Sequence, residues 1–454
     1  MAEFVFSRPS GLSSLFHLRA EHAVEDLRLF QHQTGPHMNR PENHTKQVCG
    51  DGDTLRRPWT QGMTPLLALL GLLSLAAETL ADDLAGPDYC DDCSAVSEAS
   101  GLDGHLWCQA DYLLWWMRSC DVPALVTTSV AGTSPNAAGV LGLETTQVLF
   151  GGDRLAHPVH PGGGIRLGWW FDDCQSQGLE IGYAGLAGRN SGFAAASATV
   201  PILARPFLDL TTGQQGAMLV AHPDFLEGAV DVDLESSWQS FGLAYRQSLL
   251  RHCRCRIDWL IGWRFARLDD VLRITQSSRY TAPQGQIVAG TTKEVWDVFD
   301  SENEFQGGEI GFVYHDRRGC WTGELMLRVA LGGAVGRVGV HGGTTTTVPG
   351  AGTATFDGGL LAQTTNEGFY REDGFAVLPE LAVKLGYELH PGLRLSVGYG
   401  LVALSRVLRA ADQVDLSMSQ LPPEPPTGSM HPQFPASTRA FWAQGLQFGL
   451  EYAF

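Results

Sequence analysis

Apolar and polar residues alternate along ten segments of this chain. In the clearest, 255–268, large apolar residues hold the odd positions from Ile257 to Phe265, and charged or small residues hold most even ones. A period of two places successive side chains on opposite faces of a β-strand. The pattern therefore predicts an all-β protein whose strands are 106–118, 163–172, 178–187, 230–248, 255–268, 305–315, 321–333, 375–388, 393–404 and 439–454.

The connections between these strands alternate between long and short. The long ones are 119–162, 188–229, 269–304, 334–374 and 405–438, and the short ones are 173–178, 249–254, 316–320 and 389–392. Bacterial outer-membrane barrels have short periplasmic turns and long extracellular loops. We predict an antiparallel up-and-down transmembrane β-barrel of about ten strands, or twelve if a long loop hides a hairpin.

The bulky apolar parity is expected to face lipid. The fourth strand departs from this, because Val230, Val232 and Leu234 have the opposite parity to Phe241 and Leu243. A β-bulge near 236–240 would restore the alternation. A soluble β-sandwich or repeat protein is the alternative, with the apolar parity in its core. The membrane barrel is favoured because Trp and Tyr lie near strand ends and the connections sort by length.

The other parity carries charged residues that would line the lumen. They are Asp111, Arg166, Asp172, Glu180, Arg246, Asp258, Arg264, Glu309, Glu324, Arg328, Glu380, Lys384, Arg394 and Glu451. One interpretation is a pore lining with a slight cation preference. The other is a salt-bridge network that fills a closed barrel, since about eight strands leave an interior just filled by side chains.

An apolar block of 12 residues, 66–77, precedes the barrel, with the small residues Thr79 and Ala81 at cleavage-site spacing. This predicts a signal peptide at 63–81. Residues 1–62 are then an over-extended start or an unstructured leader, with Met38 as one possible true start and a genuine N-terminal extension as the alternative. Residues 82–104 are expected to be a periplasmic segment, and 105–454 the barrel.

Export would place the cysteines in an oxidising compartment, where disulfides are the default. Cys174, Cys253, Cys255 and Cys320 fall in or beside the short turns. We predict disulfides among these four at the periplasmic rim, with the connectivity open. A zinc site built on the C-x-x-C of residues 90–93 is the alternative, and a single such pair is a weak signal.

Other function classes find little support. A net charge of −18 argues against nucleic acid. No run of 18 apolar residues exists to form a spanning helix. Asp269 and Asp270, with His315 or His341, form no recognisable catalytic constellation, so we expect no enzyme, cofactor or metal.

The last strand ends in alternating apolar residues that include Tyr452 and Phe454. This ending is similar to the signal that the outer-membrane β-barrel assembly machinery recognises. It predicts that machinery and outer-membrane lipid as partners, and leaves the oligomeric state open.

Several segments also resemble the planctomycete family of β-barrel porins, type seven. They are 110–116 (ADYLLWW) followed by 123–128 (PALVTT), 262–265 with 268–270, 378–381 with 385–387, 397–400, and the ending 441–454. The resemblance covers about 105–454. One departure is 407–413, where Arg-Pro-Gly is expected. The family implies an outer-membrane barrel and transfers no catalytic or binding residues.

These patterns together predict a bacterial outer-membrane β-barrel, in the first place a porin for passive passage of small polar solutes. The alternative is a closed structural or adhesin-like surface barrel with loop-borne ligand binding. A barrel hydrolase is the least favoured of the three.

Overall fold

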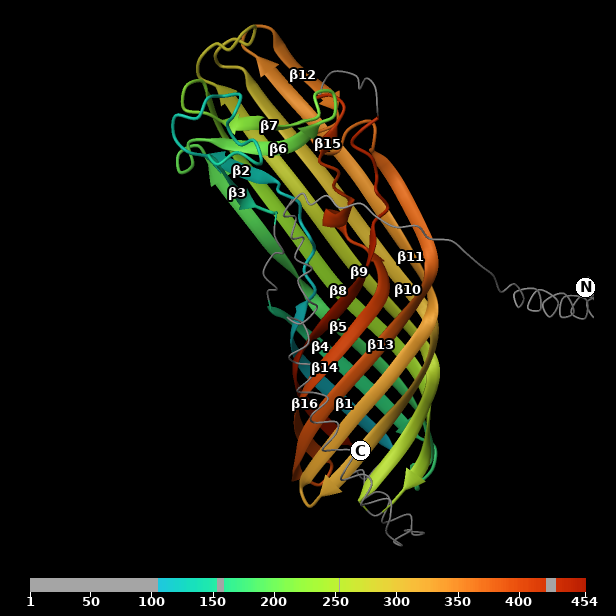
Figure 1. The fold of residues 1–454 in the computed structure, drawn as a ribbon. Helices are drawn as coiled ribbons and strands as arrows, with labels where there is room; N and C mark the ends of the chain where they lie inside the picture. Colours follow the sequence, from blue (N-terminus) through green and yellow to red (C-terminus); the bar gives the residue numbers. More distant parts are fainter. Residues whose placement is uncertain (1–104, 153–158, 253, 422–429) are drawn as a thin grey trace, which may run out of the picture. The chain divides into compact units, whose positions relative to one another are not determined.

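The computed structural model describes residues 105–152, 159–252, 254–421 and 430–454 (Figure 1). The expected leader, signal peptide and segment 82–104 lie outside these ranges. One antiparallel sheet contains eleven strands, of which β12 pairs only with β11, and the other ten close into a ring through the β10–β11 and β1–β16 pairings. The ring strands are β1 (Leu106–Met117), β4 (Val159–Trp170), β5 (Gln177–Ala196), β8 (Leu226–Arg251), β9 (Cys255–Tyr280), β10 (Thr292–Arg318), β11 (Trp321–Val348), β13 (Gly368–His390), β14 (Leu393–Leu408) and β16 (Thr438–Ala453). The predicted all-β, ten-stranded antiparallel barrel is confirmed.

The strands differ greatly in length. β1 and β4 have 12 residues each, whereas β8, β9, β10 and β11 have 26 to 28. A tilted strand crosses a bilayer in about 9–11 residues. The long strands therefore continue past the membrane as a sheet that rises above the barrel (Figure 1). Much of the predicted loops 269–304 and 334–374 is strand for this reason.

The outward face of the long strands changes character along its length. On β9, Ile261 and Trp263 are exposed apolar residues. Farther along the same face, Arg267 forms ion pairs with Asp269 and Glu302. Charged groups are costly on a lipid-facing surface. The outer edge of the lipid-facing belt therefore lies close to residue 265 on this strand.

The inward face of the long strands changes from charged to apolar in the same direction, away from the lipid-facing belt. Val230, Val232 and Leu234 are buried, and β8 pairs with β9 without a register shift from Leu226 to Ser248. The bulge predicted near 236–240 is therefore wrong for β8. A register shift does lie opposite Ser236 and Trp238, but its extra residue is on β5, between Leu186 and Arg189. The apolar parity changes sides because the strand leaves the lipid, so its inward face meets a protein core and its outward face meets water.

That core lies under a second, smaller sheet, which we call the cap sheet. It comprises β2 (Val126–Ser129), β3 (Thr146–Phe150), β6 (Leu203–Asp209), β7 (Gln214–Ala221) and β15 (Ser417–Met418). Its buried residues, such as Leu203 and Val220, form one cluster with Val232, Ile274 and Phe299 of the long strands. The cap sheet and the extended barrel wall therefore share one hydrophobic core.

Two further elements complete the fold. The strand β12 (Gly352–Asp357) forms a hairpin with β11, and η2 (Ala410–Gln413) is a short 3₁₀ helix between β14 and β16. The described ranges contain no helix with the length and apolar character needed to cross a membrane.

Candidate functional site: the lumen and its cap

The part of the lumen nearer to the short turns, which we call its lower part, holds a network of buried ion pairs. We call this network the charged layer. Except for Asp172, all the residues predicted to line the lumen take part. Their pairings are Arg166–Glu324, Lys384–Asp111, Arg394–Glu451, Arg264 with Glu309 and Glu380, Arg246 with Glu180 and Asp258, and Arg328 with Glu180 and Glu309. Burying a charge is tolerable where it is paired and hydrogen-bonded. The alternation therefore places acidic and basic side chains together on the inward face, where they form ion pairs.

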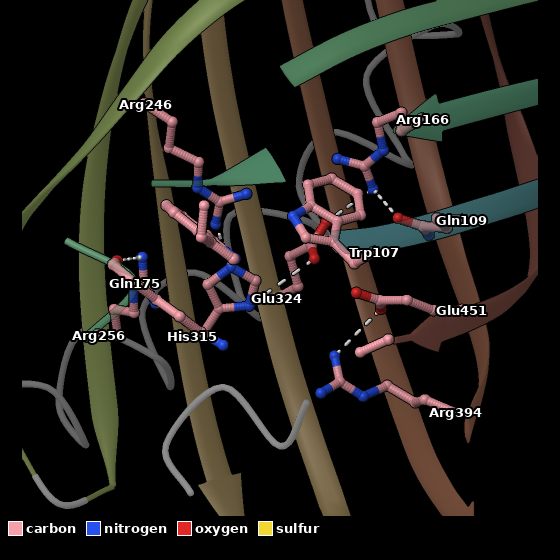
Figure 2. Close-up of a pocket in the computed structure, with 12 residues that line it drawn as sticks. Trp107, Gln109, Arg166, Gln175, Arg246, Arg256, His315, Glu324, Arg394 and Glu451 are labelled. Carbon is pink, nitrogen blue, oxygen red and sulfur yellow. Dashed lines mark hydrogen bonds and ion pairs between the residues drawn. The ribbon is translucent and has the colours of Figure 1, made fainter. Parts of the chain in front are cut away.

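Several of these pairs reach across the lumen. Arg166 Nη2 lies 3.1 Å from Glu324 Oε1. Arg166 is on β4 and Glu324 on β11, and four strands lie between them in either direction around the ring. The same guanidinium donates to Gln109 Oε1 at 2.6 Å (Figure 2). A single ion pair thus joins opposite walls of the barrel.

The charged layer also contains residues that the sequence reasoning missed. Arg256 is 1% exposed, pairs with Asp258 at 2.6 Å and lies 4.3 Å from the ring centroid of Trp170. His315 Nε2 lies 2.7 Å from Arg246 Nη2 (Figure 2). The alternation of inward and outward positions could have identified both residues, because Arg256 lies on the same face as Asp258 and His315 lies on the same face as Glu309.

Asp172 does not join this network, which corrects its predicted place in the lumen. β4 ends at Trp170, so the alternation stops before Asp172. Its carboxylate instead accepts a hydrogen bond from the backbone N–H of Ser176 at 2.7 Å, within the turn to β5.

Little space remains within the charged layer. One cavity near Arg246 and His315 has a volume of about 30 Å³ (Figure 2), and another beside Arg264 and Lys384 about 60 Å³. Volumes of this size hold a few water molecules at most. These two cavities are too small for a solute such as a sugar or an amino acid.

An apolar layer crosses the lumen above the charged layer. Trp238 of β8 and Phe441 of β16 stack with ring centroids 5.2 Å apart. Three ring strands lie between β8 and β16 on one side and five on the other, so this contact also crosses the lumen. The layer comprises Leu113, Trp115, Met117, Leu186, Trp238, Ala266, Leu268, Phe305, Ala330, Ala334, Ala376, Leu378, Val402, Leu404, Val407, Phe441 and Ala443.

The connection from β14 to β16 folds into the mouth of the barrel above the apolar layer. Arg409, 5% exposed, forms an ion pair with Asp270 and donates to the backbone oxygen of Arg118 at 3.1 Å. The side chain of Asn303 holds the neighbouring Leu408 by both its backbone N–H and its carbonyl. Asp270, for which the sequence suggested no role, is thus a structural anchor.

Burial shifts two pKa values in this region. It raises the pKa of the Asp412 carboxyl to about 6, although nearby Arg409 acts in the opposite direction. It also raises the pKa of the Cys120 thiol to about 12. Both groups are therefore less readily ionised than in water.

The cap sheet is tied to the barrel wall by a second buried ion pair. Arg205 Nη2 of β6 lies 2.6 Å from Asp297 Oδ2 of β10, and both side chains are almost fully buried. The other carboxylate oxygen accepts the backbone N–H groups of Leu361 and Ala362, each at 2.8 Å. Asp297 therefore fastens the cap sheet and the segment before β13 to one strand.

Two of the four cysteines predicted to form disulfides do not do so. Cys255 and Cys320 are both thiols, so the predicted pairing is wrong for these two. Cys174 is disulfide-bonded, and Cys253 lies outside the described residues. The C-x-x-C at 90–93 lies outside them as well. Within the described ranges, no cluster of His, Cys, Asp and Glu is arranged to hold a metal ion.

The fold and the lumen together define an outer-membrane β-barrel. The family model described as "Putative beta barrel porin-7 (BBP7)" matches residues 107–454, and the chain belongs to this family. No curated protein matches the chain.

The chain is also similar to solved outer-membrane proteins, each 8% identical to it. The outer-membrane protease OmpT from Escherichia coli has a TM-score of 0.38 and covers 77% of this chain and 96% of its own. A FadL homologue from Pseudomonas aeruginosa has a TM-score of 0.22 with coverage of 81% and 96%. The toluene transporter TbuX from Ralstonia pickettii has a TM-score of 0.15 with coverage of 82% and 96%. At this level of similarity these proteins carry no argument about activity or substrate.

Proposed function

We propose that this protein is a closed outer-membrane barrel that holds a folded sheet at the cell surface. The observation that carries the proposal is the contact of side chains from opposite walls at two successive levels. Arg166 meets Glu324 in the charged layer, and Trp238 meets Phe441 in the apolar layer. Passive passage of small polar solutes would require both levels to open.

The energetic cost of opening supports the closed state. Separating the buried pairs would leave charges unpaired in a region of low dielectric, which costs several kcal/mol for each pair. Opening the apolar layer would expose side chains such as Phe305 and Leu378, which are at most 1% exposed. The barrel is therefore proposed to act as a membrane anchor for its extracellular part, without enzymatic activity.

The remaining parts of the proposal concern export and insertion. A signal peptide at 63–81 would direct the chain across the inner membrane. The barrel assembly machinery would then recognise the strand that ends at Tyr452 and Phe454, and outer-membrane lipid would contact the apolar belt. These partners are inferred from the sequence alone.

Conductance in planar bilayers tests the proposal. The purified full-length protein is expected to give no stable single-channel steps, whereas a known general porin in the same bilayers gives regular ones. Replacing both apolar contacts, in Trp238→Ala/Phe441→Ala, is expected to leave the wild-type result unchanged, because the charged layer still blocks the path. Regular steps from the wild-type protein would overturn the closed-barrel proposal and favour solute passage.

A further inference from the structure

The outward face of the extracellular sheet carries a groove that is separate from the lumen. It has a volume of about 560 Å³ and crosses the outer halves of β5, β8, β9 and β10. Strands in a sheet lie about 4.8 Å apart, so four strands span about 14 Å. We propose that this groove binds an oligosaccharide at the cell surface. The proposal rests on the proposed function only in that this sheet must face the outside.

The strand register builds the groove from two neighbouring rows of side chains. In the first row Ala194, Asp231, Thr275 and Trp296 lie next to one another on adjacent strands. In the second row, two residues farther along each strand, the corresponding side chains are those of Ala196, Ala229, Ser277 and Glu294. Small residues thus form one end, and an aromatic ring, a carboxylate and hydroxyls the other.

Trp296 provides an aromatic surface at one end of the groove. Its side chain is 41% exposed although it lies outside the lipid-facing belt, on the face that carries Glu302 and Glu304. It is paired with Gly343 on β11, where a Cβ would lie 2.7 Å from the indole Nε1. The glycine therefore lets the indole pack against the neighbouring strand while part of it stays open to water.

The groove combines the groups that recognise sugars. The electron-rich face of an indole attracts partially positive C–H groups, such as those of a pyranose ring. Carboxylates accept hydrogen bonds and hydroxyls both donate and accept them, which matches the hydroxyl groups of a glycan. Asp231, Glu294, Thr275 and Ser277 are all exposed. The two carboxylates favour a neutral or amino-sugar chain and disfavour an acidic one.

A second aromatic residue lies on the same outward surface. Phe369 of β13 is 83% exposed and contacts the ring of His341, with centroids 5.0 Å apart. It is paired with Gly339 of β11, four residues from the Gly343 that faces Trp296. At about 3.3 Å per residue, the two aromatic positions are about 13 Å apart along that strand. A glycan that leaves the groove beyond Trp296 would meet Phe369 next.

Isothermal titration calorimetry, in which an oligosaccharide is added to the full-length protein in detergent micelles, tests the proposal. The probes are three hexasaccharides: cellohexaose (neutral), a chitosan hexamer (cationic) and a galacturonate hexamer (acidic). We expect the neutral and the cationic hexamers to bind and the acidic one not to bind.

The variants test whether the groove is the binding site. Trp296→Ala should weaken binding at least tenfold, and Ala229→Trp, which fills the groove without removing a polar group, should have a similar effect. The matched control is Trp321→Ala, which removes an exposed tryptophan at the other end of the barrel and should bind as the wild type does.

The possible outcomes separate the alternatives. The groove proposal is overturned if none of the probes binds, if Trp296→Ala and Ala229→Trp both bind like the wild type, or if Trp321→Ala weakens binding as much. Binding of the cationic hexamer alone, unaffected by Trp296→Ala, would indicate simple charge attraction and also overturn it. Because binding and conductance are separate readouts, a conducting protein would contradict the closed barrel and leave the groove standing.

Discussion

Asp412 shows how burial sets the behaviour of one carboxyl group. The Nε of Arg439 lies 3.3 Å from its Oδ2, yet neither carboxylate oxygen accepts a hydrogen bond among the described residues. Burial raises the pKa of this group from its usual value near 3.8 to about 6. The folded protein thus holds the proton more tightly than the unfolded chain does. The stability that this group contributes is full below pH 4 and is lost as the pH rises through 6.

The substitution Asp412→Asn should therefore stabilise the protein at pH 7.5, by about 1 kcal/mol after allowance for solvent screening. At pH 4 the substitution should have little effect, because the native carboxyl is then protonated. Thermal unfolding in detergent between pH 4 and 8 measures this difference. Equal melting shifts at both pH values would show that the carboxyl is not the cause.

The cross-lumen pair of Arg166 and Glu324 leads to a second prediction at this scale. Arg166→Ala leaves Glu324 buried without its main partner, and breaking such a pair costs about 3–5 kcal/mol. The exposed pair of Arg371 and Asp373 is the matched control, since both side chains are more than half exposed. Arg371→Ala should cost less than about 1 kcal/mol. Denaturant unfolding of the refolded barrel compares the two, and similar losses would contradict the assigned burial.

At the scale of single elements, β9, β10 and β11 each serve two environments. The portion of β11 with Leu327 and Leu331 exposed faces lipid, and the portion with Arg337 faces water. The period of two continues through both portions, because the pleat of a strand does not depend on its surroundings. What changes is which face carries the apolar side chains.

This division predicts that the folding cost of an introduced arginine depends steeply on its position along β11. Leu327→Arg places a charge on the lipid-facing belt and should cost about 2–4 kcal/mol, whereas Val335→Arg, on the same face but beside Arg337, should cost less than about 1 kcal/mol. Folding into lipid vesicles of known composition measures both values. Equal costs would mean that the lipid-facing belt ends elsewhere.

At the scale of the whole molecule, closing the ring depends on the last strand, which pairs with both β1 and β14. Phe454 is 68% exposed, and its backbone N–H donates to the carbonyl of Leu106 at 2.8 Å. If Tyr452 and Phe454 form the assembly signal, their rings matter before the barrel closes. In the closed barrel both rings are exposed on the outward face and contact each other.

Phe454→Ser should therefore lower the amount of protein in the outer membrane several-fold and leave the melting temperature of the assembled fraction nearly unchanged. Phe448→Ser, which alters another outward phenylalanine on the same strand, separates loss of the signal from loss of lipid contact. Cell fractionation followed by heat-modifiability gels gives both readouts. An unchanged outer-membrane level for Phe454→Ser would refute the assembly role.

Much of the barrel could be predicted because its signals are local. Ile261, Trp263 and Phe265 alternate with small or charged residues whatever the rest of the chain does, and this alternation predicts all ten strands of the ring. Their ends were harder to predict. Beyond residue 268 of β9 the charged residues change faces, so the pattern predicts loops where β9, β10 and β11 continue as strands.

The sequence by itself indicated a barrel of about ten strands and, for most of them, the face that meets lipid, because these features follow from a period of two within single segments. The sequence left open whether the lumen is closed, and the proposal that it is closed rests on the tertiary structure. Closure depends on whether side chains far apart in sequence, such as Arg166 and Glu324, are long enough to meet across the ring. The cap sheet was decided in the same way, because β6 pairs with β2 and β15 from distant parts of the chain. The outer groove depends on strand ends that the local pattern did not predict as strand.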